Sequence, residues 1–294
     1  MNGLARIVSA QAPVRVDLAG GWTDVAPYTH DFGGEVVNFA IAIHAHAKLE
    51  VDDAGKLDVH YGADARVGSG LGTTGAINVA LMGAIGGADL SREAAVERAF
   101  GLEALLGNRG GKQDQWAASH GGFNHLMFIG DKVEPLPFEI LDSCRAWLHR
   151  QFLIVDTGIP HVSGDLHEGI WARYGAGETS VIEGLHTIRR AARTMAEGLG
   201  GDRRDKVVDA LREVCRGVDA LDPALHDPFR EVVDPLLASR DVMAWKALGA
   251  GAGGCAGLLA GNRRMDAVRA AVEAAGWTIL EWDYDDDGLV VNAN

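Results

Sequence analysis

The chain has 294 residues, which predicts one large or two modest domains with room for a sizeable hydrophobic core. Hydrophobic residues make up 47% and charged residues 23%, a composition that excludes a mainly disordered chain. The formal net charge of −14 opposes binding to nucleic acid and to anionic lipid surfaces. An anionic ligand would therefore need a local device, such as backbone N–H groups, a metal ion or one placed arginine.

The cysteines and the apolar runs indicate the compartment. Cys144, Cys215 and Cys255 lie far apart and have no Cys-x-x-Cys spacing, so they indicate free thiols rather than a disulfide framework or a zinc site. The start of the chain lacks a basic end followed by an apolar stretch, and no apolar run reaches the roughly 18 residues of a membrane span. We therefore expect a cytoplasmic protein.

The first half of the chain alternates between predicted strands and helices. Apolar and polar positions partly alternate in the strand-like segments 13–21, 35–51, 56–61, 121–130 and 146–158. A buried-helix pattern covers 75–87, and a clearer helix covers 91–107. Ser91 is the expected N-cap of this second helix, and Gly107 ends it.

The second half is mainly helical and closes with strands. The pattern is almost wholly helical from 163 to about 221, and 241–248 also indicates a helix. Two strand-like pieces, 277–282 and 288–292, follow a last helix and are joined by an acidic hairpin turn. This order predicts an α+β chain of two lobes that meet near residue 150.

A glycine-rich loop at Gly68–Gly75 runs directly into an apolar helix and is the first candidate binding site. Glycines let a backbone approach a ligand closely, and the first turn of a helix offers unpaired N–H donors at the positive end of its dipole. Such a turn can bind phosphate, and a hydroxyl of Thr73 or Thr74 could ligate a hard cation shared with it. The same residues also fit a plain glycine turn capped by threonine, because 39 of the 294 residues are glycine.

Two nucleotide-binding patterns can be tested against this loop. The Gly-Lys-Ser/Thr ending of a Walker A motif does not occur in the sequence. The Gly-x-Gly-x-x-Gly spacing of dinucleotide-binding proteins occurs at Gly70–Gly75 and again at Gly249–Gly254. Neither segment follows directly on a predicted strand, so we discount both, and with them an NAD-dependent oxidoreductase.

The second candidate is the segment Gly20–Asp24, which follows the first predicted strand. A carboxylate beside glycines and an aromatic residue suits a sugar, because Asp24 can accept hydrogen bonds from hydroxyls while Trp22 covers an apolar ring face. A β-turn in which the aspartate bonds its own backbone is the alternative.

The third candidate is Asp114, which lies downstream of Glu103 and after a tight glycine turn. Flanked by Gln113 and Gln115, Asp114 could accept a hydroxyl proton as a general base. The alternative is that Asp114 is the N-cap of the helix that follows it.

Two weaker patterns are given structural interpretations. The acidic run at 283–288 reproduces the first half of a calcium loop, but its twelfth position is Asn294 rather than glutamate, so we interpret it as a hairpin turn. His44 and His46 share one face of a predicted strand and lack a third ligand nearby, which favours a surface or core pair over a metal site.

Four segments, taken in order, resemble the GHMP family of small-molecule kinases, named after galactokinase, homoserine kinase, mevalonate kinase and phosphomevalonate kinase. They are APVRVDLAGGWTD, GSGLGTTGA, GKQDQWAASHGGFN and LGAGAGGCAG. The likeness is greatest to the sugar 1-kinase branch, since GGWTD resembles fucokinase and GKQDQWAASHGGFN resembles heptose 7-phosphate 1-kinase. The resemblance implies an N-terminal lobe (1–150) similar to ribosomal S5 domain 2 and a ferredoxin-like C-terminal lobe (151–294).

The resemblance also implies a role for each motif residue. Asp114 becomes the catalytic aspartate, Arg15 stabilises the attacking oxygen, and Thr74 and Glu103 bind magnesium. The residues implied to bind the ATP phosphates are Gly68, Ser69, Gly70, Leu71, Gly72, Thr73, Thr74 and Gly75. The residues implied to bind the substrate are Gly21, Trp22, Thr23, Asp24, Gln113, Gly251 and Gly253.

Two departures from the family pattern bear on the ligands. The stretch from Lys48 to Val67 is much shorter than the family counterpart that helps to enclose the adenine, which leaves the donor open. His161 stands where related heptose kinases often have arginine, which implies a substrate without a second phosphate.

The implied activity is that of a magnesium-dependent ATP:sugar kinase acting on the anomeric C1 hydroxyl of a heptose, a heptose phosphate or a related sugar. The alternatives are a fucose-like deoxysugar 1-kinase and a non-catalytic sugar- or nucleotide-binding relative. The expected partner is a small-molecule sugar or sugar phosphate, without nucleic acid or membrane, and the expected state is a monomer or homodimer.

Overall fold

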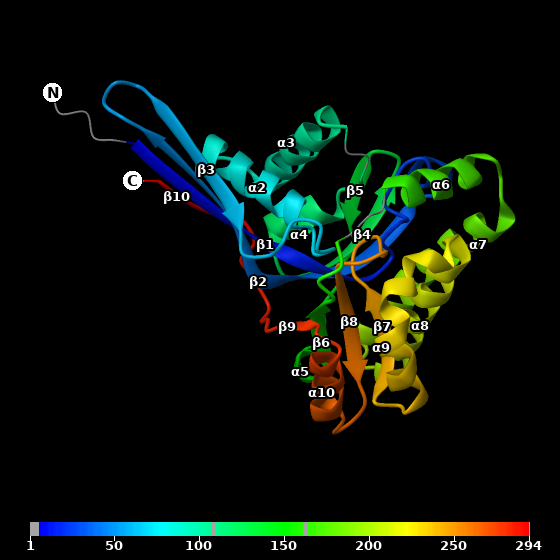
Figure 1. The fold of residues 1–294 in the computed structure, drawn as a ribbon. Helices are drawn as coiled ribbons and strands as arrows, with labels where there is room; N and C mark the ends of the chain where they lie inside the picture. Colours follow the sequence, from blue (N-terminus) through cyan, green and yellow to red (C-terminus); the bar gives the residue numbers. More distant parts are fainter. Residues whose placement is uncertain (1–5, 108–109, 161–163, 294) are drawn as a thin grey trace.

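The computed structural model describes residues 6–107, 110–160 and 164–293, which form two antiparallel sheets and the helices around them (Figure 1). The first sheet has the order β10-β1-β2-β4-β5, and β3 pairs with β2 at its far end. Its strands are β1 (Arg6–Ala19), β2 (Gly34–Val51), β3 (Leu57–Ala63), β4 (Phe123–Ile129), β5 (Lys132–Pro135) and β10 (Val290–Ala293).

The second sheet has the order β7-β8-β6-β9. Its strands are β6 (Phe152–Asp156), β7 (Val242–Ala247), β8 (Cys255–Ala260) and β9 (Thr278–Leu280). Since β10 pairs with β1, the last strand of the chain lies in the sheet built by the first half. The division of the chain at residue 150 stays a prediction.

The helices lie around both sheets, with α2, α3 and α4 together on one side of the first sheet (Figure 1). They are α1 (Tyr28–Asp31), α2 (Thr73–Gly86), α3 (Arg92–Leu105), α4 (Gln113–His120), α5 (Asp142–Gln151), α6 (Gly164–Gly175), α7 (Thr179–Gly200), α8 (Arg204–Leu221), α9 (Asp227–Ala238) and α10 (Met265–Ala274), with a short 3-10 turn at Pro223–Leu225. The predicted N-cap is confirmed, because the Ser91 hydroxyl accepts a hydrogen bond from the Ala94 N–H at 3.2 Å. The mixed α+β class is also confirmed.

Three predicted elements are wrong. Residues 142–151 form helix α5 where 146–158 was expected to be all strand, because Cys144, Trp147 and Leu148 are buried at helical spacing. Residues 242–247 form strand β7, since the short apolar run 242–245 fits a buried strand as well as a helix. The acidic turn at 283–288 is a connection between sheets, because β9 pairs with β6 whereas β10 pairs with β1.

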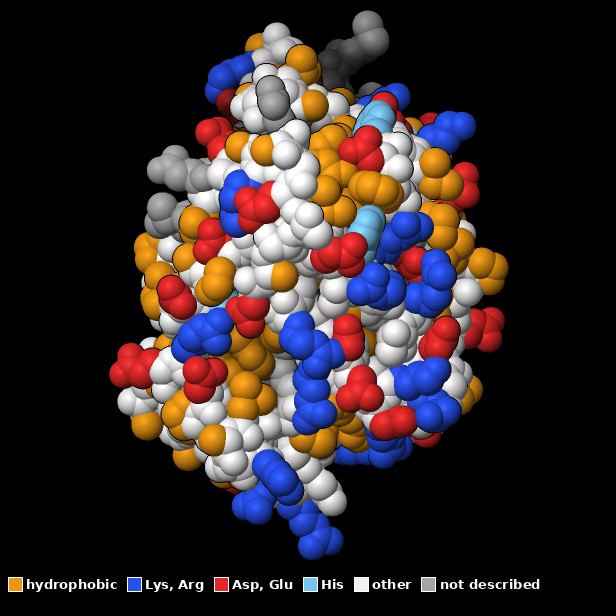
Figure 2. All heavy atoms as spheres, turned by 90° about the vertical axis from the view of Figure 1, so that its right-hand side faces the viewer, with side chains coloured by type: hydrophobic (Ala, Val, Ile, Leu, Met, Phe, Trp, Pro, Cys, Tyr) orange, Lys and Arg blue, Asp and Glu red, His pale blue; other side chains and the backbone are white. Residues whose placement is uncertain are grey.

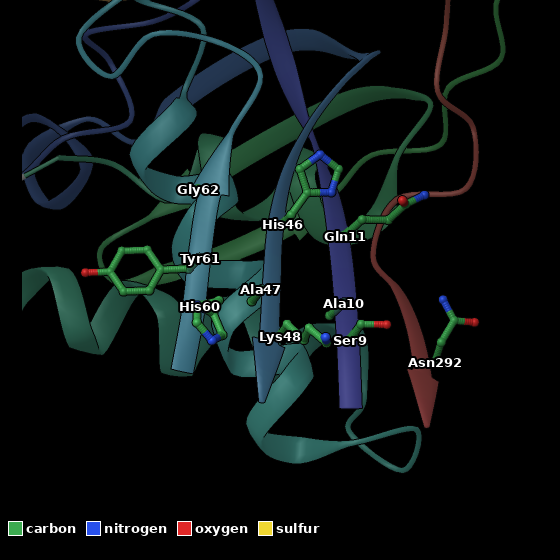
Figure 3. A pocket seen from close by; sticks show the side chains of 10 residues that line it. All are labelled: Ser9, Ala10, Gln11, His46, Ala47, Lys48, His60, Tyr61, Gly62 and Asn292. Carbon is green, nitrogen blue, oxygen red and sulfur yellow. The ribbon is translucent and has the colours of Figure 1, made fainter. Parts of the chain in front are cut away.

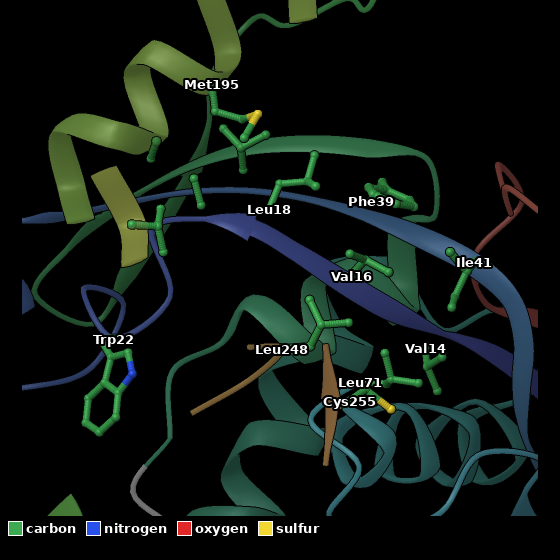
Figure 4. Close-up of a cluster of buried hydrophobic side chains, with 14 of the residues drawn as sticks. Val14, Val16, Leu18, Trp22, Phe39, Ile41, Leu71, Met195, Leu248 and Cys255 are labelled. Atoms are coloured by element: carbon green, nitrogen blue, oxygen red, sulfur yellow. The ribbon is translucent and has the colours of Figure 1, made fainter. Parts of the chain in front are cut away.

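The hydrophobic core runs from the first sheet to the second and anchors the glycine-rich loop. Figure 4 shows Leu71 of this loop beside Val14 of β1 and Cys255 of β8, all three fully or almost fully buried. In the same view Met195 of α7 packs on the other side of β1 and β2. The side chain of Leu71 therefore anchors the glycine-rich loop in the hydrophobic core between the two sheets.

The face that carries α7 and α8 is polar and mixed in charge. Figure 2 shows Lys and Arg side chains interspersed with Asp and Glu over this face. Arg203 with Asp205 and Arg204 with Asp202 form ion pairs there, at 3.0 and 3.1 Å. Within the described ranges, no helix combines the length and apolar character that crossing a bilayer would require.

Candidate active site

A cleft of about 920 Å³ collects residues from five separate parts of the chain. Its walls come from β1 and the loop after it, the glycine-rich loop and start of α2, the stretch from the end of α3 to the first turn of α4, helix α6, and the second glycine loop (residues 249–254). Most of the predicted site residues line it: Arg15, Gly21, Trp22, Asp24, Gly68, Gly70, Gly72, Thr73, Thr74, Glu103, Gln113 and Asp114. The sequence motifs thus meet in one place, although the roles given to their residues remain predictions.

Helix α2 opens onto this cleft without a side-chain cap, and the first N–H groups of a helix have no partner within the helix. Gly72 precedes the helix with a φ of 73°, a left-handed conformation that glycine adopts without strain. Thr73 is buried and fixes the loop from inside, because its hydroxyl donates to Arg66 O at 3.2 Å and lies 3.3 Å from the Ser69 hydroxyl. Ser69 and Leu71 therefore support the loop from within and do not line the cleft.

Asp114 lies directly against the start of α2. An ideal Cβ on Gly72 would be 3.0 Å from Asp114 Cγ, and one on Gly75 would be 2.7 Å from Asp114 Cβ. Glycine at these two positions is what allows the carboxylate to approach the helix end. Asp114 belongs to the first turn of α4, whose N-cap is Lys112, so the interpretation of Asp114 as an N-cap is wrong.

Arg15 is bonded to Asp114. Its Nη2 lies 2.6 Å from Asp114 Oδ1, while its Nη1 donates to Gly70 O. The Arg15 side chain is 5% exposed and that of Asp114 is 29% exposed, so the carboxylate reaches the cleft while its partner is buried behind it. One guanidinium therefore links the proposed base to the glycine-rich loop.

The second glycine loop, residues 249–254, braces the first. A Cβ on Gly70 would lie 2.2 Å from Leu248 O, and one on Gly249 would lie 2.8 Å from Gly70 Cα. Gly249 lines the cleft, whereas a Cβ on Gly251 would meet Leu225 O and one on Gly253 would meet Ile159 O. The structure thus places Gly251 and Gly253 against neighbouring backbone, outside the cleft lining.

The segment after β1 brings a second carboxylate to the cleft. Asp24 is 6% exposed and lies so close to Gly111 that a Cβ there would be 1.9 Å from Asp24 Oδ2. Thr23 is fully buried; its hydroxyl donates to Gly20 O at 2.7 Å and accepts from the Glu35 N–H at 3.1 Å, so it shapes the turn from beneath. Trp22 lines the cleft, with its ring centroid 4.4 Å from that of His167.

The acidity of Asp24 is strongly perturbed. Burial raises its pKa to about 7, the nearby carboxylates of Asp114 and Asp17 add to the rise, and Arg15 opposes it. A carboxyl group that titrates near neutral pH in a cleft marks a candidate functional position.

Glu103 and Thr74 also line the cleft, next to the start of α2. Asn78 lies one helical turn after Thr74 on the same face, and its amide donates to Glu103 Oε1 at 3.0 Å. Gln115 donates to the same oxygen at 2.7 Å. A buried carboxylate held by two amides beside a threonine hydroxyl is a set of hard oxygen donors, which suits magnesium shared with substrate phosphates.

Sequence reasoning missed four cleft residues: Asp17, His167, Glu168 and Trp171. Asp17 had a signal, because residues 15 and 17 of one strand point to the same face and Arg15 was already a candidate. The other three lie on α6, a helix with no recognisable motif. His161 lies outside the described residues.

The remaining candidates lie elsewhere. His44 bonds Asp285 at 2.7 Å and His46 bonds Asp64 at 3.2 Å, so each histidine has a carboxylate partner. A second hollow of about 330 Å³ lies where β3, β2, β1 and β10 run side by side, and Figure 3 shows its side chains spread along the sheet surface. It contains none of the predicted site residues.

The comparisons with known proteins agree with this fold. Residues 36–122 match the sequence profile described as the GHMP kinases N terminal domain. A solved structure described as a D-glycero-D-manno-heptose 1-phosphate kinase from Bacteroides thetaiotaomicron superposes with a TM-score of 0.78 over 97% of this chain and 98% of that chain, at 20% identity. The fold is thus the α+β fold of the GHMP kinases.

Two relatives are detected by sequence along most of the chain. The D-glycero-alpha-D-manno-heptose 7-phosphate kinase of Campylobacter jejuni is 25% identical over 300 residues, which span 85% of this chain and 88% of that protein. The bifunctional fucokinase/GDP-fucose pyrophosphorylase of Arabidopsis thaliana is 24% identical over 318 residues, which span 87% of this chain and 30% of that protein. Residues 36–122 thus match a GHMP kinase N-terminal domain, and the likeness of most of the chain to sugar kinases indicates a phosphotransferase.

Proposed function

We propose that the protein is an ATP-dependent sugar kinase that phosphorylates the anomeric C1 hydroxyl of a heptose, a heptose phosphate or a related sugar. The observation that carries the proposal is the Arg15–Asp114 pair, joined at 2.6 Å and seated against the first turn of α2. A phosphate bound at the end of that helix would lie beside the carboxylate that activates the acceptor. The relatives described as heptose and fucose kinases support the choice of a sugar.

In this proposal the start of α2 holds the donor phosphates. The unpaired N–H groups after Gly72 and the positive end of the helix dipole compensate negative charge, which lets a chain of net charge −14 bind ATP. Thr74 and Glu103 would hold magnesium, which neutralises charge on the phosphates when bound. Phosphoryl transfer needs mainly such positioning and neutralisation.

Asp114 and Arg15 would act on the acceptor. Asp114 accepts the proton of the C1 hydroxyl as its oxygen bonds to the γ-phosphorus, and the bond from that phosphorus to the ADP oxygen breaks. Arg15 holds Asp114 in place by its ion pair, and its charge stabilises the attacking oxygen. Asp24, on the other side of the cleft, binds a sugar hydroxyl.

The experiment combines a sugar panel with one substitution. The protein is incubated with magnesium-ATP and heptoses, heptose phosphates, fucose and galactose; the product is followed by mass, and phosphorus NMR locates the phosphate on the ring. Asp114→Asn should lower kcat at least about 10²-fold, the share that a positioned base supplies. Asp53→Asn changes an exposed carboxylate in the β2–β3 turn and is the matched control, with wild-type rates expected.

The outcomes separate the alternatives. A C1 phosphate formed only on fucose-like sugars would identify a deoxysugar kinase. Nucleotide binding without turnover of any sugar would identify a non-catalytic relative and refute the proposal. Turnover that survives Asp114→Asn unchanged would refute the role of the Arg15–Asp114 pair.

A further inference from the structure

The cleft contains buried polar atoms that have no hydrogen-bond partner among the described residues. Among them are two acceptors, Asp17 Oδ1 and Gln113 Oε1, and two donors, Trp22 Nε1 and Arg15 Nε. All four residues line the cleft. Leaving buried polar atoms unbonded is unfavourable, so this arrangement is explained when a ligand supplies the missing partners.

These atoms come from adjoining structures. A Cβ on Gly21 would lie 2.0 Å from Asp17 Oδ2 and 3.3 Å from Gln113 Nε2, so both side chains converge on the space beside this glycine. Trp22 is the next residue, and its ring contacts His167 and Trp171 of α6, with centroids 4.4 and 6.2 Å away. An aromatic wall thus stands beside two acceptors, the combination that holds a ring with hydroxyls on it.

Asp17 forms an ion pair with a residue that is distant in the sequence. Lys246 of β7 donates to Asp17 Oδ2 at 2.8 Å, and the two side chains are 5% and 1% exposed. The other oxygen of Asp17 is left without a partner. Lys246 therefore bonds Oδ2 of Asp17 and leaves Oδ1 to accept a hydrogen bond from a ligand.

The described residues that line the cleft carry more negative than positive charge, which disfavours a second phosphate. Their side chains include five carboxylates, those of Asp17, Asp24, Glu103, Asp114 and Glu168. Arg15 is the one lysine or arginine among these lining residues, and it is already bonded to Asp114. The raised pKa of Asp24, caused by burial and by its two acidic neighbours, agrees with a negative field at this end.

We infer that the acceptor is an unphosphorylated sugar, and that Asp17, held by Lys246, is a specificity-determining residue that binds one of its hydroxyls. Gln113 accepts from a second hydroxyl, and the Trp22 N–H donates to a ring or hydroxyl oxygen. A phosphate ester on the acceptor would meet these carboxylates, and the described lining residues offer no lysine or arginine other than Arg15 to balance its charge. This inference rests on the proposed sugar kinase activity and narrows it to the neutral substrates.

The test compares one sugar with and without its phosphate. Initial rates are measured with D-glycero-D-manno-heptose and its 7-phosphate as a matched pair, and with fucose. A kcat/KM for a neutral sugar at least about tenfold above that for the 7-phosphate is expected, since a factor of ten corresponds to one modest electrostatic contact. A preference for the 7-phosphate would overturn the inference and leave the kinase intact, whereas no turnover on any sugar would overturn both.

The role of Asp17 is tested separately. Asp17→Asn should raise the sugar KM at least about tenfold and change the KM for ATP less than twofold. Because this change leaves Lys246 buried without its carboxylate, the double variant Asp17→Asn with Lys246→Met keeps the pair neutral and should show the same KM split. Glu35→Gln, in a 1% exposed ion-paired carboxylate outside the cleft, is the control expected to keep the wild-type KM. A wild-type sugar KM in the folded Asp17 variants would overturn the role.

Discussion

The contact between Gly75 and Asp114 makes a quantitative prediction about catalysis. In Gly75→Ala the new Cβ would lie 2.7 Å from Asp114 Cβ, about 0.7 Å short of an ordinary contact. Since the neighbour is the first carbon of the side chain and not its flexible end, α4 has to move by several tenths of an ångström to make room. Asp114 would then leave the position in which Arg15 holds it.

The size of the effect follows from that shift. A misplacement of about 1 Å costs roughly 10²-fold in rate, so Gly75→Ala should lower kcat by about 10- to 100-fold. The substitution also adds a better helix former inside α2, which offsets part of the packing cost in stability by up to about 1 kcal/mol. The loss of kcat should therefore be larger than the fraction of unfolded protein, calculated from the urea unfolding midpoint, can explain.

The assay pairs initial rates with urea unfolding, and the chain offers a matched control. Gly101 lies inside α3, and a Cβ there would have no neighbour within 4 Å. Gly101→Ala should therefore stabilise the protein by about 0.5–1 kcal/mol and leave kcat unchanged. If Gly75→Ala turns over at the wild-type rate while its fold is intact, the position of Asp114 against α2 does not govern the reaction.

Three further predictions concern stability and its dependence on pH. The pKa of Asp24 is about 7 in the folded protein against an ordinary value of 3.8, so the unfolded chain loses this proton first and the free energy of unfolding falls between about pH 4 and 7. In urea titrations Asp24→Asn should therefore recover up to about 4 kcal/mol at pH 8 and almost nothing at pH 4. Equal gains at both pH values would refute the argument. Leu71→Ala should cost about 2–5 kcal/mol and raise the KM for ATP, because it removes the apolar anchor of the glycine-rich loop; an unchanged KM would separate the loop from the nucleotide. Ser91→Ala should cost about 1 kcal/mol through the lost N-cap of α3 with kcat unchanged, as measured by thermal unfolding and initial rates.

The proposed catalytic groups could be found from the sequence because their signals are local. Glycines that open a helix, and a carboxylate after a tight turn, keep their meaning whatever the rest of the chain does, so Gly72, Gly75 and Asp114 could be grouped from motif order. The structure then places them in contact. Helices α2 and α3 were also predictable, since their boundaries depend on glycines and on the Ser91 cap.

What sequence reasoning missed depends on pairing over long distances. Asp17 and Lys246 are 229 positions apart, and nothing local to either residue names the other. The acidic turn at 283–288 was misread because a hairpin and a connection between sheets have the same local pattern, and only the partners of β9 and β10 distinguish them. Residues 146–151 were misread because aromatic and β-prone residues occupy the buried face of α5.

The interlocked loops around Gly70 and Gly249 have an evolutionary consequence. Atoms of the opposite loop occupy the space that a side chain at Gly70 or Gly249 would need, so neither glycine can be replaced by a larger residue unless the other loop moves as well. Residues 36–122, the stretch recognised by the family profile, omit both Arg15 and the bracing loop. Grafting residues 36–122 alone onto another scaffold would transfer the family profile without Arg15 and the second glycine loop. In homologues, substitutions at the positions of Gly70 and Gly249 should occur together.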